Sequence, residues 1–163
     1  MNKDLHFSSK KDSWLTPKYI FNYFDRAYSF DLDPCATAEN ALCKRYFTIE
    51  QDGLLQSWTD CKVFLNPPYG RDIYKWVRKS YFESQNNNAT VVCLLPARTD
   101  TRWFWNYCRY GLIHFLQGRV KFSNHHNCAP FPSMIVVFDK GITSTGNGKI
   151  FDVEHNLIKS DHD

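Results

Sequence analysis

Apolar residues recur along the chain with two periods, one typical of helices and one typical of strands. After Thr16-Pro17, residues Ile20, Phe24 and Ala27 share one face at helical spacing. This pattern predicts a helix of about ten residues, with Thr16 as its N-cap and Pro17 as its first helical residue. The same periodicity predicts helices over 73–81 and about 100–107.

Short apolar runs between these helices predict strands over 28–33, 63–65, 90–95, 112–116 and 133–138. Because strands alternate with helices, we expect an α/β protein with a mostly parallel sheet. The last two predicted strands have no long helix between them, which favours an antiparallel pair at one edge of the sheet.

The length of 163 residues favours a single compact domain over 1–163. The pattern of elements occupies a core of about 14–140, and the tail 141–163 is weakly patterned. Two-domain enzymes are excluded by this length.

Charge and cysteine content narrow the class of protein only slightly. The formal net charge of +3 is compatible with a nucleic-acid partner without requiring one. The six cysteines form no C-x-x-C pair, so we expect small buried apolar groups and no metal site. The start of the chain contains no apolar signal segment and no run is long enough to span a membrane, so we expect a cytoplasmic protein.

Acidic residues lie where the first strand is stopped by proline, in the segment Asp31-Leu32-Asp33-Pro34. Open α/β sheets bind ligands at the carboxyl ends of their strands, and a carboxylate there suits a ligand with hydroxyls or a positive charge. Asp52-Gly53 adds a further carboxylate in a turn. Neither G-x-G-x-x-G nor a P-loop occurs, so we expect a cofactor that is not held by its phosphates.

The second strand ends in Asn66-Pro67-Pro68-Tyr69. The Asn66 amide and the Pro67 carbonyl offer two acceptors for an exocyclic amine, and Tyr69 offers an aromatic face for a planar base. An equally simple interpretation of these four residues alone is a tight turn closed by the Asn66 side chain.

The ordered set of motifs resembles the phage-type DNA N6-adenine methyltransferases, a Dam-like family, over roughly 14–138. The segments that support the resemblance are Trp14-Leu15-Thr16-Pro17, Phe30-Asp31-Leu32-Asp33-Pro34-Cys35-Ala36, Asp52-Gly53-Leu54 with Trp58, Asn66-Pro67-Pro68-Tyr69, Pro96-Ala97-Arg98-Thr99-Asp100-Thr101, Gly118-Arg119-Val120 and Ala129-Pro130-Phe131-Pro132-Ser133. The resemblance implies a Rossmann-like S-adenosylmethionine-dependent methyltransferase fold, encoded by a phage or prophage and located in the host cytoplasm.

By this resemblance, S-adenosylmethionine is the cofactor, and its contacts are Thr16, Pro17, Asp31, Asp33, Pro34 and Asp52. Asn66, Pro67, Pro68 and Tyr69 are the catalytic tetrad. The implied reaction is direct methyl transfer to an adenine flipped out of duplex DNA. Asn66 Oδ1 and the Pro67 carbonyl would accept hydrogen bonds from N6 while Tyr69 stacks on the base.

Contacts to DNA are expected from Arg98, Arg102, Arg119 and Lys121. Arg98, Arg102 and Arg109 are spaced so that they would share one broad helical face, and Arg119 and Lys121 lie at the start of the 118–132 loop. Since a methyltransferase domain fills nearly the whole chain, target reading must come from this loop or from a second subunit in a homodimer. Methylation of RNA or of a protein glutamine, and a non-catalytic DNA-binding module, remain alternative functions.

Overall fold

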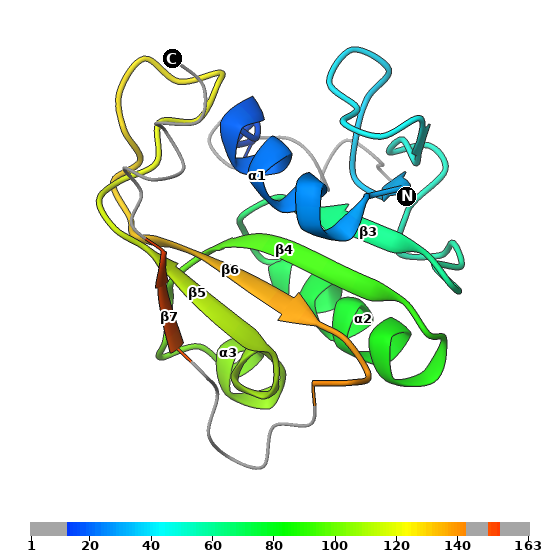
Figure 1. Cartoon of the computed structure of the whole chain (residues 1–163). Coiled ribbons are helices and arrows are strands. Elements are labelled where there is room, and N and C mark those ends of the chain that lie inside the picture. The colour runs from blue at the N-terminus through cyan, green and yellow to red at the C-terminus, as the bar shows by residue number, and fades with distance from the viewer. Residues whose placement is uncertain (1–12, 143–149, 154–163) are drawn as a thin grey trace.

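The computed structural model of the protein describes residues 13–142 and 150–153. Its centre is a seven-stranded sheet with the strand order β2-β1-β3-β4-β6-β5-β7 (Figure 1). The strands are β1 (Leu32–Asp33), β2 (Arg45–Tyr46), β3 (Lys62–Leu65), β4 (Thr90–Pro96), β5 (Leu112–Leu116), β6 (Ser133–Phe138) and β7 (Ile150–Val153). An α/β protein with a mostly parallel sheet is therefore confirmed.

In the described part of the chain, β6 is the only strand that runs against the others. It lies between β4 and β5, and it pairs antiparallel with both. The predicted antiparallel pair of β5 and β6 is present, but its predicted place at the edge of the sheet is wrong. Strand β7, from the weakly patterned tail, lies outside β5 and runs parallel to it.

Helix α1 (Lys18–Tyr28) covers one face of the sheet, and α2 (Ile73–Asn86) and the short α3 (Arg102–Asn106) cover the other (Figure 1). Helix α1 buries its predicted apolar stripe, including Ile20 and Phe24. The assignment of Thr16 as N-cap is wrong, because the helix begins at Lys18 and Pro17 stands at the capping position.

The central strands follow directly from the sequence. All seven residues of β4 are buried, as expected for a strand covered on both faces. Strands β5 and β6 have the predicted bounds. The first predicted strand is shorter than expected, because α1 continues to Tyr28 and only Leu32–Asp33 joins the sheet.

Four cysteines, Cys43, Cys61, Cys93 and Cys108, are buried as predicted, whereas Cys35 is half-buried and Cys128 is exposed. Burial raises the pKa of the Cys43 and Cys93 thiols to about 12, so both stay protonated and unreactive at neutral pH. Within 13–142 and 150–153, no helix is long and apolar enough to cross a membrane.

Candidate active site

Strands β1, β3 and β4 are neighbours and parallel, so their carboxyl ends meet at one edge of the sheet. Leu32 of β1 is paired with Val63 of β3, which brings Asp33 and Asn66 to the same end of adjacent strands. The two strand ends that the sequence singles out are therefore neighbours in the fold, at the edge where α/β proteins bind ligands.

The Asp33 side chain is buried, with 5% of its surface exposed. Its two carboxylate oxygens accept hydrogen bonds from the backbone N–H groups of Cys35 (3.3 Å) and Leu42 (3.2 Å). Burial raises the pKa of this carboxyl to about 6, against the opposing effect of the two N–H groups. Among the described residues no Lys or Arg forms an ion pair with it.

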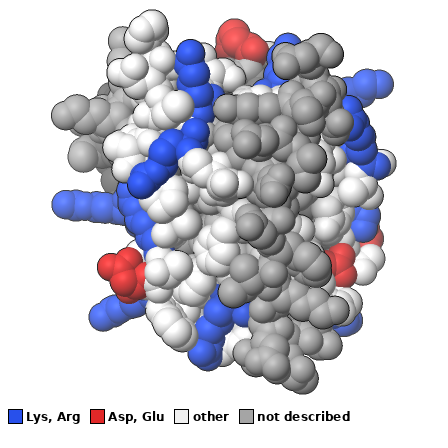
Figure 2. All heavy atoms as spheres, turned by 60° about the vertical axis from the view of Figure 1, so that its left-hand side comes forward, with Lys and Arg blue, Asp and Glu red and all other residues white. Residues whose placement is uncertain are grey.

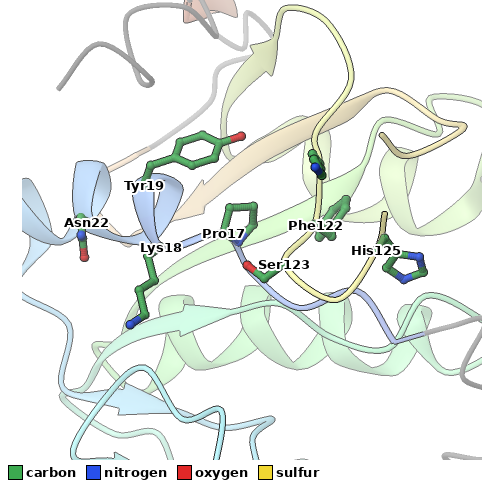
Figure 3. Close-up of a pocket in the computed structure, with 8 residues that line it drawn as sticks. Pro17, Lys18, Tyr19, Asn22, Phe122, Ser123 and His125 are labelled. Carbon is green, nitrogen blue, oxygen red and sulfur yellow. The ribbon is translucent and has the colours of Figure 1, made fainter. Parts of the chain in front are cut away.

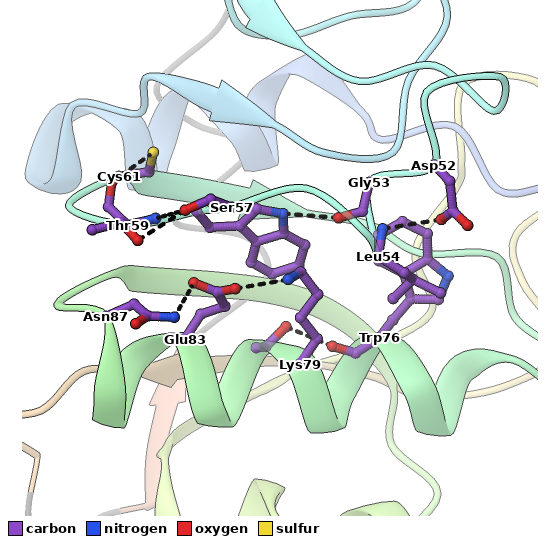
Figure 4. Close-up of polar contacts among 12 residues, drawn as sticks. Asp52, Gly53, Leu54, Ser57, Thr59, Cys61, Trp76, Lys79, Glu83 and Asn87 are labelled. Atoms are coloured by element: carbon purple, nitrogen blue, oxygen red, sulfur yellow. Dashed lines mark hydrogen bonds and ion pairs between the residues drawn. The ribbon is translucent and has the colours of Figure 1, made fainter.

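The Asp52-Gly53 turn packs against this strand end. A Cβ atom on Gly53 would lie 2.0 Å from the Pro34 carbonyl oxygen, so only glycine permits this approach. The Gly53 carbonyl in turn accepts a hydrogen bond from Nε1 of the fully buried Trp58, at 3.0 Å (Figure 4). The structure thus brings Asp52, Pro34 and Asp33 into one region, as a shared ligand would require.

Asp31 has a different environment from Asp33. It is exposed, and its carboxylate accepts the backbone N–H of Lys62 at 2.9 Å, where β3 begins. Asp31 therefore lies beside the amino end of β3, and this hydrogen bond gives it a structural role in joining β1 to β3.

Asn66 follows β3 directly, and its side-chain amide is satisfied on one side only. Nδ2 donates to the Trp14 carbonyl oxygen and to Thr16 Oγ1, the latter at 2.9 Å. Oδ1 is buried and has no hydrogen-bond partner in the part of the chain that the structure describes. A buried acceptor without a partner costs about 1–3 kcal/mol, a cost that a bound donor group would remove.

Tyr69 is covered in this structure, with 3% of its surface exposed, so the expected open aromatic face is not available. Its hydroxyl donates to the Leu94 carbonyl of β4 at 3.0 Å. Its ring makes edge contacts with Phe122 and Phe131, at centroid distances of 6.1 Å and 5.7 Å. This burial also raises the pKa of the Tyr69 hydroxyl well above its usual value, which keeps it a hydrogen-bond donor.

The segment 13–16 is held by the 118–132 loop through contacts that the sequence did not predict. Oδ1 of Asn124 accepts a hydrogen bond from the Leu15 N–H at 2.8 Å. Nδ2 of the same side chain donates to the Ser13 carbonyl at 3.0 Å. The Ser123 N–H donates to the Leu15 carbonyl at 2.9 Å. The Trp14 ring stacks on His125 with centroids 3.9 Å apart. The sequence offered one indication of this contact. Both Trp14-Leu15-Thr16-Pro17 and the two ends of the 118–132 loop are among the motifs that resemble the Dam-like family.

The cations expected to contact DNA are all exposed: Arg98, Arg102, Arg119 and Lys121. The guanidinium of Arg98 lies 5.9 Å from the centre of the Phe131 ring, which packs against Tyr69. The prediction of one shared helical face is wrong, because α3 ends at Asn106 and Arg109 belongs to the separate 3₁₀ helix η2 (Cys108–Tyr110).

The 118–132 loop lies on the left in Figure 1. Figure 2 turns this side of the molecule toward the viewer. The charged side chains coloured on this face are mainly Lys and Arg. A face of this kind suits a polyanion such as nucleic acid.

A cavity of about 480 Å³ lies between the start of α1 and the 118–132 loop (Figure 3). Pro17, Lys18 and Tyr19 line it on the helix side, and Lys121 and Ser123 line it on the loop side. Neither Asp33 nor Asn66 lines this cavity, so it adjoins the strand-end site without being that site.

The mixed α/β sheet is compatible with a methyltransferase fold, and the bare amide oxygen at the end of β3 suits an enzyme that acts on an amine. Residues 5–149 match the family described as DNA N-6-adenine-methyltransferase (Dam). A DNA N-6-adenine-methyltransferase of Haemophilus phage HP1 (strain HP1c1) is 31% identical over 148 residues, which is 85% of this chain and 85% of that protein. The chain therefore belongs to the Dam family of DNA N-6-adenine-methyltransferases.

A second relative, the DNA N-6-adenine-methyltransferase of Escherichia phage T1, is 38% identical over 97 residues. That match spans 58% of this chain and 40% of the T1 protein. The resemblance to the phage-type family is confirmed by both relatives.

Proposed function

We propose that this protein transfers a methyl group from S-adenosylmethionine to N6 of an adenine flipped out of duplex DNA, at the edge of the sheet where β1, β3 and β4 end. Adenine-N6 methylation of DNA is the reaction of the family to which the chain belongs. The proposal extends this reaction by naming the methyl donor, the flipped-out base and the role of each residue. The observation that supports them most directly is the buried, unpartnered Oδ1 of Asn66.

The residues at the end of β1 fit a cationic methyl donor. The Asp33 carboxyl is buried without an ion-pair partner in the described part of the chain and has a pKa of about 6, so a bound positive charge would stabilise its ionised form. When bound, S-adenosylmethionine supplies an electrophilic methyl group on a sulfonium. Asp33, Pro34 and Asp52 would hold this donor, with Pro17 from the start of α1 beside them.

The end of β3 fits the target amine. The adenine N6 group carries two N–H donors, and Asn66 Oδ1 and the Pro67 carbonyl would accept one each. These bonds would orient the nitrogen lone pair toward the methyl group and exclude water from it. Because amine and donor would be held together, most of the rate acceleration would come from positioning and fixed dipoles.

Tyr69 would contact the base only after a local change. Phe122 and Phe131 cover its ring, and both belong to the 118–132 loop. We place the contacts to DNA on the same loop, through Arg119 and Lys121, and on Arg98 beside Phe131. Binding of duplex DNA would then displace the half-buried Phe131 side chain, while the loop backbone at 123–124 stays bonded to residues 13–15, and would uncover Tyr69 for stacking, which is worth about 1–3 kcal/mol.

An acceptor comparison tests this function. The protein is incubated with S-adenosylmethionine labelled with tritium in the methyl group and with duplex DNA, RNA or unlabelled protein. We expect label in DNA alone, released as N6-methyladenine. Label in RNA or protein but not in DNA would contradict the proposal and would favour the other amine and amide substrates that Asn66-Pro67-Pro68-Tyr69 could accommodate.

A further inference from the structure

The two hydrogen bonds donated by Asn66 come from one short segment, far away in sequence. The Trp14 carbonyl and Thr16 Oγ1 lie 52 and 50 residues before Asn66, and both accept from Nδ2. Together they satisfy the donor half of the amide and leave the acceptor half, Oδ1, without a partner among the described residues.

These contacts also determine which way the amide points. A backbone carbonyl oxygen can only accept a hydrogen bond, so the Asn66 atom that faces Trp14 must be the nitrogen. The opposite rotamer would place Oδ1 against the Trp14 oxygen and turn Nδ2, a donor, toward the substrate. A donor there would meet the N–H groups of the target amine and could not bind them.

The accepting segment is itself held in place. Asn124 pairs with the backbone on both sides of Trp14, through the Leu15 N–H and the Ser13 carbonyl. Ser123 adds a backbone bond to the Leu15 carbonyl. The position of the Trp14 carbonyl therefore depends on the 118–132 loop.

We infer that Thr16 is a positioning residue, which together with the Trp14 carbonyl holds the Asn66 amide with Oδ1 toward the target amine. This role rests on the proposed function, and it replaces direct contact with the methyl donor as the main task of Thr16. The hydroxyl is already used by Asn66, and α1 begins without a bond from it.

The test compares Thr16→Val, which removes the hydroxyl at nearly constant shape, with Thr16→Ser, which retains it. Thr59→Val, in an exposed turn before β3, is the matched control. We expect Thr16→Val to lower kcat by about threefold to tenfold, the range of one hydrogen bond, with Kd for S-adenosylmethionine unchanged. Thr16→Ser should restore the wild-type kcat.

A second readout does not depend on activity. In ¹⁵N-labelled protein, the Asn66 side-chain amide is identified as the signal lost in Asn66→Asp. We expect its two protons to exchange slowly with solvent in the wild type, and faster in Thr16→Val but not in Thr59→Val. Thermal melting of each variant shows whether it is folded.

An unchanged kcat and amide signal in Thr16→Val would overturn the inference, as would a weakened Kd for S-adenosylmethionine with kcat retained. A wild-type protein that methylates no DNA would instead contradict the proposed function. The amide exchange would in that case still decide whether Thr16 orients Asn66.

Discussion

The ends of β1 and β3 lie side by side, yet they use their polar side chains in opposite ways. At β1, both oxygens of Asp33 accept backbone N–H groups of the loop that follows. At β3, the Asn66 amide is satisfied on its donor side and bare on its acceptor side. The difference underlies the proposed division of roles, in which Asp33 would face the charge of the methyl donor and Asn66 Oδ1 would accept from the target amine.

The largest effect that would test this comparison is expected from Asn66→Ala. Removing an oriented group that contacts the reacting amine costs about 100- to 1000-fold in rate. Single-turnover kinetics should show this loss, and calorimetry should show unchanged S-adenosylmethionine binding. Asp33→Ala should have the reverse pattern, with the loss in cofactor binding. If Asn66→Ala lost the cofactor instead, the division of roles between the two strand ends would be wrong.

Gly53→Ala tests the packing of the Asp52 turn on the β1 end. The added Cβ would meet the Pro34 carbonyl, a backbone atom that cannot rotate away. We expect a loss of about 3 kcal/mol in the free energy of unfolding, the upper end for overpacking, together with weaker cofactor binding. Gly141→Ala is the control, since among the described residues its Cβ would approach only the Asp139 side chain, at 3.2 Å. Equal stability of the two variants in urea unfolding would contradict this packing role.

A smaller effect is expected from pH, through Asp33. The folded-state pKa of about 6 is above the ordinary value of 3.8, so folding favours the protonated carboxyl. The contribution of this group to stability is therefore present below about pH 4 and is lost as the pH rises through about 6. A cationic ligand has the opposite preference, because it binds the ionised form better.

The affinity for S-adenosylmethionine should accordingly rise by up to about tenfold between about pH 5 and 7. Calorimetry across this range measures the change. 5′-Methylthioadenosine, which lacks both positive charges of the donor, is the control and should bind with nearly constant affinity. A flat profile for S-adenosylmethionine would show that Asp33 does not face the charge of the donor.

The smallest effect concerns the loop beside the β3 end. Replacing Arg119 and Lys121 by glutamine should weaken duplex binding several-fold at moderate salt and reduce the slope of log K against log salt concentration by about 2. Lys75→Gln is a suitable control, because Lys75 belongs to α2, outside the 118–132 loop, and pairs with Asp72 at 2.8 Å. An unchanged salt slope in the double variant would place the DNA contacts elsewhere.

Periodic burial explains which elements could be predicted from the sequence. Strands β4 and β6 each bury a continuous run and helix α1 buries an apolar stripe, and the positions of these elements follow from this burial. Strand β2 contains only Arg45 and Tyr46, one exposed and one half-buried, so two residues offered no pattern to detect. The helix cap assigned to Thr16 was wrong because its hydroxyl bonds to Asn66, 50 residues away.

The sequence indicated which candidate residues would lie near one another, but not the environment of each. The motifs identified Asp33, Asp52 and Asn66, and the fold brings these strand ends and turns together. Local sequence could not show that Asp31 bonds to Lys62, or that Phe122 and Phe131 cover Tyr69. These contacts join segments distant in sequence, so they depend on the packed fold.

The most direct test of the central claim is a nucleoside analysis of duplex DNA after incubation with S-adenosylmethionine and either the wild-type protein or Asn66→Ala. We predict that Asn66→Ala forms N6-methyladenine about 100- to 1000-fold more slowly than the wild type, although both proteins are folded and bind the cofactor equally. N6-methyladenine produced by Asn66→Ala at the wild-type rate would contradict the assignment of the bare amide oxygen at the end of β3 as the group that holds the target amine.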